Sequence, residues 1–482
     1  MPARSWLADL RSRLGASGGK ADGLGILAFE AAATMSRLVS LHRTLSDAEF
    51  RRLRADVLRA EGVARLTSAD QSLLLRLACA ELVADLDRAA SATARLAARC
   101  CACAAEASPP LLRDFDGLYA DAKRGRLAQL DAAVGFSRGA AKRLRKMERH
   151  VAAAARLYEE MDALRELEAS ERRMESWKQH SGPIIPSQAA PGKKKPDPGE
   201  KLMRELRAQR QKVRRHMEGS LWSVDAGRAA KLMAKSVLAV LGRISITFGA
   251  LVPGLPSLTV GRTWPLGHSS GPLHRSAMPG AALRHSAPIF GQKDTAALSV
   301  LESIKPSAST IGGSGMELRY ANVILSVETV LAALRPLPPA GGSGGEEVHQ
   351  EGMVDLSKRD GLYKMLPVSI REAVNAKLRE SWRGQHAAVD VEAAAAARGE
   401  VERVLRWLGP MAHDTLRWSD ERSMEQGQRF SMQPRALMVQ TLHFADRKKT
   451  DAAIVDVLVR LSCVCWYDDE RRRLESVDWE NE

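Results

Sequence analysis

Apolar residues recur every three or four positions along most of the chain, and this is the spacing of one face of an α-helix. One such series is Met147, Val151, Ala154, Tyr158, Met161 and Leu164. A second is Leu202, Leu206, Val213 and Met217. We expect the two series to pack as a helical hairpin arm; an intermolecular coiled coil is the alternative, although Arg165 and Glu168 interrupt its seam. No convincing run alternates with a period of two, so the pattern predicts an all-α fold with negligible β-sheet.

Short sequence signals indicate where helices begin and end. Ser46 is followed three residues later by Glu49, which is a capping box: the Ser46 hydroxyl accepts from the amide of Glu49, whose carboxylate reaches back. Ser68 and Gln71 repeat this spacing before a further apolar series, and Gly62 between them suits a helix end. Short connections of this kind favour neighbouring antiparallel helices.

Three stretches rich in Pro, Gly and Ser break the helical pattern, and we expect long disordered linkers there. The predicted organisation is an N-terminal segment (1–20), an N-terminal helical domain (21–180), a basic Pro/Gly linker (181–199), long helices packing with the N-terminal domain (200–252), a disordered linker (253–309), a C-terminal helical domain (310–467) with a flexible loop (337–352), and an acidic tail (468–482). The linker at 253–309 would allow the two helical regions to move separately.

The amino-acid composition agrees with a helical fold and shows that the chain is basic. Of the 482 residues, 45% are hydrophobic but only 5% are aromatic, so the apolar residues are mostly Ala, Leu and Val, and Ala and Leu are strong helix formers. The 72 Lys and Arg residues exceed the 58 Asp and Glu residues, which gives a formal net charge of +14. Such an excess favours acidic partners: nucleic acid, anionic lipid or acidic protein surfaces.

The basic residues gather in two places. Lys193, Lys194 and Lys195 lie in the linker at 181–199, where an extended run of Lys can bind an import receptor; an ordinary solvated charge run is the alternative. A basic helical face follows, made of Arg204, Arg207, Arg210, Lys212, Arg214 and Arg215. Binding of nucleic acid or anionic lipid there would be weak, nonspecific and sensitive to salt.

Residue patterns that carry catalysis are weak. An all-α metal-dependent phosphohydrolase needs an adjacent His-Asp pair with further ligands, and His386, His413, Asp414 and Asp446 supply those residue types on paper. The glycines at 312–315 precede an apparent helix but lack the Lys-Ser/Thr of a phosphate-binding loop, so we expect a flexible lead-in. The six cysteines lack zinc-site spacing and indicate free thiols in a reducing compartment. We therefore expect no catalytic, metal or cofactor-binding residue, and no cofactor.

Membrane signals are also weak. The longest apolar run, 236–252, has Arg243 near its centre and suits a buried helix better than a membrane span. The first residues lack the apolar core of a signal peptide, and Pro2 excludes N-myristoylation. A short apolar stripe, Trp6, Leu7, Leu10 and Leu14, suits a frayed terminus or a partner contact better than a lipid surface. These features predict a location in the nucleus, the cytoplasm or both, with a peripheral membrane location left open.

Several blocks resemble a known pair of plant domains of unknown function. In the N-terminal half they are 24–32, Met35, 38–41, 45–47, 61–63 and 73–81, with 220–222 and 242–244 further on. In the C-terminal half they are 320–324 (YANVI), 359–367 (RDGLYKMLP), 407–413 (WLGPMAH) and 440–450 (QTLHFADRKKT). Together these ordered blocks resemble the plant PSK-simulator family. The chain departs from the family pattern at Asp414, where Asn is usual, and at Val464 and Cys465.

The resemblance implies a plant intracellular protein that promotes growth and is linked to phytosulfokine peptide signalling, with no established enzymatic activity or cofactor. The predicted function is therefore a non-enzymatic growth regulator that acts as an interaction scaffold for other proteins. A basic adaptor associated with nucleic acid or anionic membrane is the first alternative. The metal-dependent phosphohydrolase is the second, and the family's Asn at position 414 disfavours it because an amide is a poor metal ligand.

Overall fold

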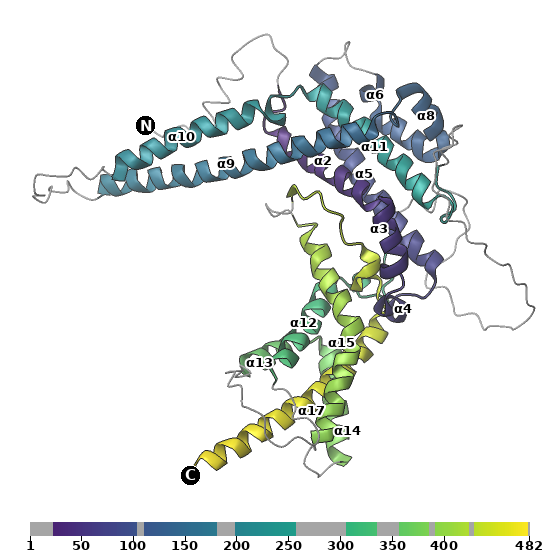
Figure 1. Cartoon of the computed structure of the whole chain (residues 1–482), viewed down its shortest axis with the longest axis vertical. Coiled ribbons are helices and arrows are strands. Elements are labelled where there is room, and N and C mark those ends of the chain that lie inside the picture. Colours follow the sequence, from purple (N-terminus) through teal and green to yellow (C-terminus); the bar gives the residue numbers. More distant parts are fainter. Residues whose placement is uncertain are drawn as a thin grey trace, which may run out of the picture.

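The computed structural model describes residues 23–103, 110–180, 198–256, 305–334, 356–384, 391–423 and 429–480. Within these ranges the regular structure is helical, and the β-structure consists of two isolated bridges, Gly23 to Asp225 and Thr310 to Asp446 (Figure 1). This confirms the predicted all-α fold.

The helices fall into two halves. The N-terminal half contains α2 (Leu27–Thr44), α3 (Asp47–Arg52), η1 (Leu53–Val57), α4 (Glu61–Leu66), α5 (Gln71–Cys103), α6 (Pro110–Arg113), α7 (Phe115–Asp121), η2 (Ala122–Arg126), α8 (Leu127–Val134), α9 (Ala140–His180), α10 (Pro198–Glu218), η3 (Leu221–Ser223) and α11 (Ala226–Phe248). The C-terminal half contains η5 (Gly312–Ser314), α12 (Glu317–Ala333), α13 (Leu356–Met365), α14 (Val368–Gly384), α15 (Val391–Asp420), η6 (Met438–Gln440), η7 (Leu442–Phe444) and α17 (Arg447–Glu480).

In the N-terminal half, α2 lies among α5, α9 and α11 (Figure 1). Its apolar residues recur at helical spacing on more than one side, so Met35, Leu38 and Leu41 are all buried. The start of α2 is fixed by the chain that precedes α11, because the Leu24 amide donates to the Val224 carbonyl at 3.0 Å. These contacts position the first turn of α2 beside the middle of α9.

The helices α9 and α10 form a hairpin arm that extends away from the rest of the molecule (Figure 1). They are antiparallel: Lys212 pairs with Glu160 at 2.7 Å, whereas Arg210, earlier in α10, approaches Glu168, later in α9, at 3.5 Å. Val151 and Val213 are fully buried between neighbouring elements. The two apolar series of the sequence therefore meet within one chain.

In the C-terminal half, α12, α15 and α17 pack together and carry α13 and α14. Tyr320 is fully buried, and its hydroxyl donates to Asp451 Oδ1 at 2.5 Å, which joins α12 to α17. The helix α17 runs without a break to Glu480, so described residues of the predicted acidic tail are its final turns. One of them, Asp469, pairs with Arg359 of α13 at 2.7 Å.

Two of the predicted helix signals differ from the structure. The Ser46 hydroxyl accepts from the Glu49 amide at 3.4 Å and caps α3, as predicted. Asp70, rather than Ser68, lies before α5 and accepts from the Ser72 amide at 2.8 Å, while the Gln71 side chain donates to the Leu58 carbonyl. Gly62 lies in the first turn of α4 and does not end a helix; it is the point where α4 approaches the backbone of α15 too closely for a side chain.

Most of the predicted linkers lie outside the described residues: 1–20 entirely, 181–197 of the basic linker, 257–304 of the long linker, and the loop 337–352. Where their edges are described, the chain is structured. Pro198 begins α10, and the Ser309 carbonyl accepts from the Arg447 amide at 2.9 Å. The glycines at 312–315 form a 3-10 turn against His443, so the expected flexible lead-in is wrong.

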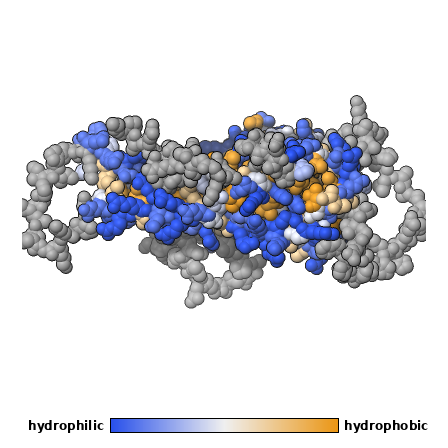
Figure 2. All heavy atoms as spheres, turned by 90° about the horizontal axis from the view of Figure 1, so that it is seen from above, coloured by the Kyte–Doolittle hydropathy of each residue, from blue (hydrophilic) through white to orange (hydrophobic). Residues whose placement is uncertain are grey.

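The two halves share one apolar core, which contradicts the expectation that they move separately. The Asp446 amide donates to the Leu66 carbonyl at 2.8 Å, and the Ser40 hydroxyl donates to the Gln433 carbonyl at 2.6 Å. Hydrophilic residues cover much of the face shown in Figure 2, with hydrophobic residues grouped between them. Among the described helices, none has a stretch long and apolar enough to span a bilayer.

Candidate functional site

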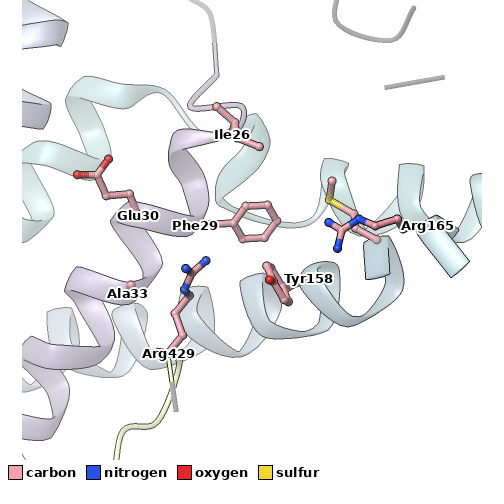
Figure 3. A pocket seen from close by; sticks show the side chains of 8 residues that line it. Ile26, Phe29, Glu30, Ala33, Tyr158, Arg165 and Arg429 are labelled. Carbon is pink, nitrogen blue, oxygen red and sulfur yellow. The ribbon is translucent and has the colours of Figure 1, made fainter. Parts of the chain in front are cut away.

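A groove opens where the first turns of α2, the middle of α9 and the chain at Arg429 come together (Figure 3). Its volume is about 390 Å³, and its lining residues are Ile26, Phe29, Glu30, Ala33, Tyr158, Met161, Arg165 and Arg429. Ile26 is 58% exposed although it is a large aliphatic residue, so its side chain is available to a partner.

Two aromatic rings, Phe29 and Tyr158, line this groove, and further rings from separate parts of the chain pack against them. Phe29 and Tyr158 meet edge to face with ring centroids 5.4 Å apart. Phe430, from the C-terminal half, lies 5.9 Å from Tyr158, and Trp222 lies 6.2 Å from Phe29. Each such pair contributes about 0.5–1.5 kcal/mol beyond its buried area. The aromatic side chains behind and within the groove therefore come from both halves, and the C-terminal half contributes Arg429 to its lining.

Charged side chains surround the apolar wall. The Arg429 guanidinium lies 5.8 Å from the centre of the Tyr158 ring, which is a cation–π contact. Glu30 pairs with Arg95 at 3.3 Å, and Arg165 pairs with Asp162 at 2.7 Å. The lining residues include no serine, cysteine or histidine, so this groove is suited to binding apolar side chains with a polar border.

A buried carboxylate joins the two halves below this region. Glu81 of α5 is 3% exposed, and it accepts from Arg422, from Trp418 Nε1 at 3.2 Å and from the Met438 amide at 2.6 Å. Burial raises the pKa of the Glu81 carboxyl above its ordinary value, although Arg422, the Met438 amide and Trp418 act in the opposite direction. Because every partner is a donor, the carboxylate is the form that satisfies this site.

A second contact joins the halves through α4 and α15. A Cβ on Gly62 would clash with the Trp407 carbonyl oxygen and would lie 2.8 Å from Met411 Sδ. Arg65, one turn later, lies 5.4 Å from the centre of the Trp407 ring. The close approach of the two helices therefore depends on a glycine.

The residues considered for a metal hydrolase do not come together. His413 Nε2 lies 2.9 Å from Glu328 Oε2 on the neighbouring α12. Asp414 bonds to Gln440, and burial raises the pKa of its carboxyl. Asp446 caps α17 by accepting from the Lys449 amide at 2.9 Å. His386 lies outside the described residues, and the described part of the chain holds no group of three or more His, Cys, Asp or Glu suited to a metal ion.

The predicted basic sites have different outcomes. Lys193, Lys194 and Lys195 lie outside the described residues. On α10, Arg210 and Lys212 are turned toward acids of α9, with which they pair. The other four residues of the predicted face are exposed: Arg204, Arg207, Arg214 and Arg215. The face available to an anionic partner is thus smaller than the sequence indicates.

The described thiols are free, and their settings differ. Burial raises the pKa of Cys79 to about 12 and that of Cys465 to about 11, so neither is a thiolate near neutral pH. Cys463 is only half-buried. The predicted free thiols agree with the structure at these three positions.

Sequence reasoning missed Glu81, Arg422 and Phe430. One signal was present: Glu81 stands directly beside Leu82 in an apolar stretch of α5, where an acid has to be paired or pay a large desolvation cost. Nothing local indicates that its partner lies 341 residues further along the chain.

Comparisons with known proteins match both halves. A model described as a domain of unknown function, DUF3475, matches residues 26–82, and a model described as a protein of unknown function, DUF668, matches residues 310–417. The first covers α2, α4 and the start of α5, and the second covers α12 to most of α15. Gly62 and Trp407, which meet between the halves, belong to these two matched segments.

Three relatives come from Arabidopsis thaliana. Protein PSK SIMULATOR 1 is 25% identical over 453 residues, which is 92% of this chain and 56% of the relative. Protein PSK SIMULATOR 3 is 25% identical over 457 residues, with the same coverages, and Protein PSK SIMULATOR 2 is 22% identical over 480 residues, 95% of this chain and 62% of the relative. The chain thus spans little more than half the length of these relatives. No solved structure matches.

Proposed function

Because the chain is a relative of the PSK-simulator proteins, we propose that it is a non-enzymatic regulator of plant growth linked to phytosulfokine signalling. It would act inside the cell by binding other proteins. The names of the relatives support the link to signalling.

The observation that carries the binding role is the groove beside Ile26. Its lining contains Phe29, from a matched segment, and Arg429, from the other half of the chain. Neither half alone contains the complete groove, so a partner bound there contacts both. The scaffold would thus present, at this groove, an exposed apolar residue, Ile26, as an anchor point for its partner.

The proposal includes access to the nucleus through Lys193, Lys194 and Lys195. Three consecutive Lys beside Pro196 suit the extended binding site of an import receptor. Fluorescent fusions of the wild type and of the variant with all three Lys replaced by Ala provide the measurement. We expect the variant to lose nuclear signal, and equal nuclear signal from both would remove this role.

The binding role is tested in seedlings that express the chain, by measuring root growth with and without added phytosulfokine. We expect the wild type to change the response and Ile26→Asp to abolish that change, because a carboxylate on the anchor repels an apolar partner. The matched control is Ile246→Asp. Ile246 is 57% exposed and lies near the C-terminal end of α11, about 30 Å along the helix axis from its first residue.

Two results would count against the binding role. If the wild type leaves the growth response unchanged, the signalling role is wrong. If both Asp variants lose the effect equally while each remains folded by circular dichroism, the effect does not pass through the groove.

A further inference from the structure

A group of four arginines lies at the junction of α2, α5 and the C-terminal half, separate from the groove. Its members are Arg37 of α2, Arg88 of α5, Arg422 after α15, and Arg435 before η6. We call them the arginine cluster. Two of the four have an acid partner: Arg422 bonds to Glu81 and lies 3.8 Å from Asp85, and Arg88 bonds to Asp85.

The cluster carries more positive than negative charge. Four guanidinium groups meet two carboxylates, those of Glu81 and Asp85. A third acid, Glu421, is already committed, since Arg417 donates to its Oε1 at 2.7 Å and the Ala436 amide donates to its Oε2 at 2.6 Å. With the Glu421–Arg417 pair neutral, the net charge of the cluster among the described residues is +2.

The arginines repel one another in a partly dehydrated place. Burial lowers the pKa of Arg37, and the nearby charge of Arg422 lowers it further. Burial, with the charges of Arg37 and Arg422, lowers the pKa of Arg435 to about 10. Such an arrangement is unfavourable in isolation, because desolvated like charges interact strongly.

One donor of the cluster lacks an acceptor. Arg37 Nε is buried and has no hydrogen-bond partner among the described residues, which is rare for a buried donor. The surrounding backbone is held firmly. The Ser40 hydroxyl donates to the Gln433 carbonyl at 2.6 Å, and Arg43 donates to the Met432 carbonyl at 3.0 Å. These bonds hold the segment that carries Arg435 against α2, which carries Arg37.

We propose that the arginine cluster binds a phosphate group, either on a free small molecule or on a phosphoserine side chain. A phosphate carries close to two negative charges near neutral pH, which matches the surplus of the cluster. Guanidinium groups bind phosphate oxygens in a bidentate manner, and the unpartnered Arg37 Nε supplies a donor. This inference is independent of the proposed growth role, because it rests only on the charges at the junction.

The test uses the full chain and compares Arg435→Gln and Arg37→Gln with the wild type. Inorganic phosphate, inositol hexakisphosphate, and a phosphoserine peptide with its unphosphorylated form are titrated at constant ionic strength, with calorimetry and melting temperature as readouts. Arg207→Gln is the matched control: it removes the same charge from the exposed face of α10.

We expect phosphate to raise the melting temperature of the wild type above that in chloride. Each cluster variant should bind phosphate about tenfold more weakly, while Arg207→Gln should bind as the wild type does. Without phosphate, the cluster variants should melt no lower than the wild type, because a repelling charge has been removed. Preferential binding of the phosphoserine peptide would identify a protein source, and binding of the free phosphates alone would identify a small molecule.

Three results would overturn the proposal. The first is no difference between phosphate and chloride for the wild type. The second is equal weakening by Arg207→Gln, which indicates diffuse attraction by the basic surface. The third is needed if a cluster variant does not fold. In that case the phosphorus NMR line width of phosphate is measured with and without the folded wild type, and equal line widths would show that no site exists.

Discussion

Among single residues, Glu81 joins the halves through bonds to Arg422, Trp418 and Met438. Replacing it with Gln removes the close anion of Arg422 and leaves only Asp85, 3.8 Å away, so we expect Glu81→Gln to lower the free energy of unfolding by about 1–3 kcal/mol. Urea denaturation of the full chain measures this change.

The control for Glu81 is Glu30→Gln. Glu30 also pairs with an arginine, Arg95, but both side chains are at least half exposed, and exposed pairs contribute about 0–1 kcal/mol. A loss below 1 kcal/mol for Glu81→Gln, or equal losses in both variants, would contradict the role assigned to the buried carboxylate.

Glu317 gives the molecule an acid-sensitive contact. Burial by itself would raise the pKa of its carboxyl, but the hydrogen bond from His443 and the local backbone amide bring it below the ordinary 4.5. A carboxyl whose pKa is lower in the folded state stabilises the fold above the unfolded value. That contribution is lost as the pH falls through the folded value.

We therefore expect the stability advantage of the wild type over Glu317→Gln to be full at pH 6 and to shrink below about pH 4.5. Chemical denaturation of both proteins from pH 7 to pH 3 measures the difference. An advantage that stays constant over this range would show that the pair does not titrate as described.

At the scale of helices, the approach of α4 to α15 is set by Gly62. A methyl group there meets the Trp407 carbonyl and Met411, so we expect Gly62→Ala to destabilise the protein by about 1–3 kcal/mol. Gly399→Ala is the matched control, because Gly399 lies in α15 with open space around its Cα. That substitution should stabilise the protein by up to about 1 kcal/mol, since Ala favours helix more than Gly. Thermal unfolding measures both, and a neutral Gly62→Ala would exclude close packing at this point.

Helix existence could be predicted from the sequence because it is governed by local spacing. The Ser46 cap and the helix from Glu317 follow from residues within one or two turns. The positions of Ser68 and Gly62 could not be interpreted locally. The Gln71 side chain bonds 13 residues back to Leu58, and Gly62 is required by a helix more than 340 residues further along the chain.

At the scale of the whole molecule, the candidate site could not be predicted either, because it also depends on contacts between residues far apart in the sequence. Periodicity identifies α2 and α9, but it does not show that Arg429 completes the groove between them, because no nearby residue constrains its position. The long Pro- and Gly-rich stretch at 253–309 suggested two separate regions. A Pro- and Gly-rich composition indicates a linker between two regions, but it does not show whether the two regions pack against each other.

Because the two halves share a core, we expect them to stay associated after the chain between them is cut. If a site for a specific protease is placed within 257–304, cleavage separates the chain into two pieces that still meet at Glu81, Gly62 and the groove. We expect the pieces to elute together in size-exclusion chromatography at micromolar concentration and to unfold in one transition, because the Glu81 contact and the apolar core cross between them. Arg422→Ala in the cleaved protein should weaken this association, since it leaves Glu81 buried without its cation. Separate elution of the pieces from the cleaved wild type, each folded, would show that the halves are independent after all.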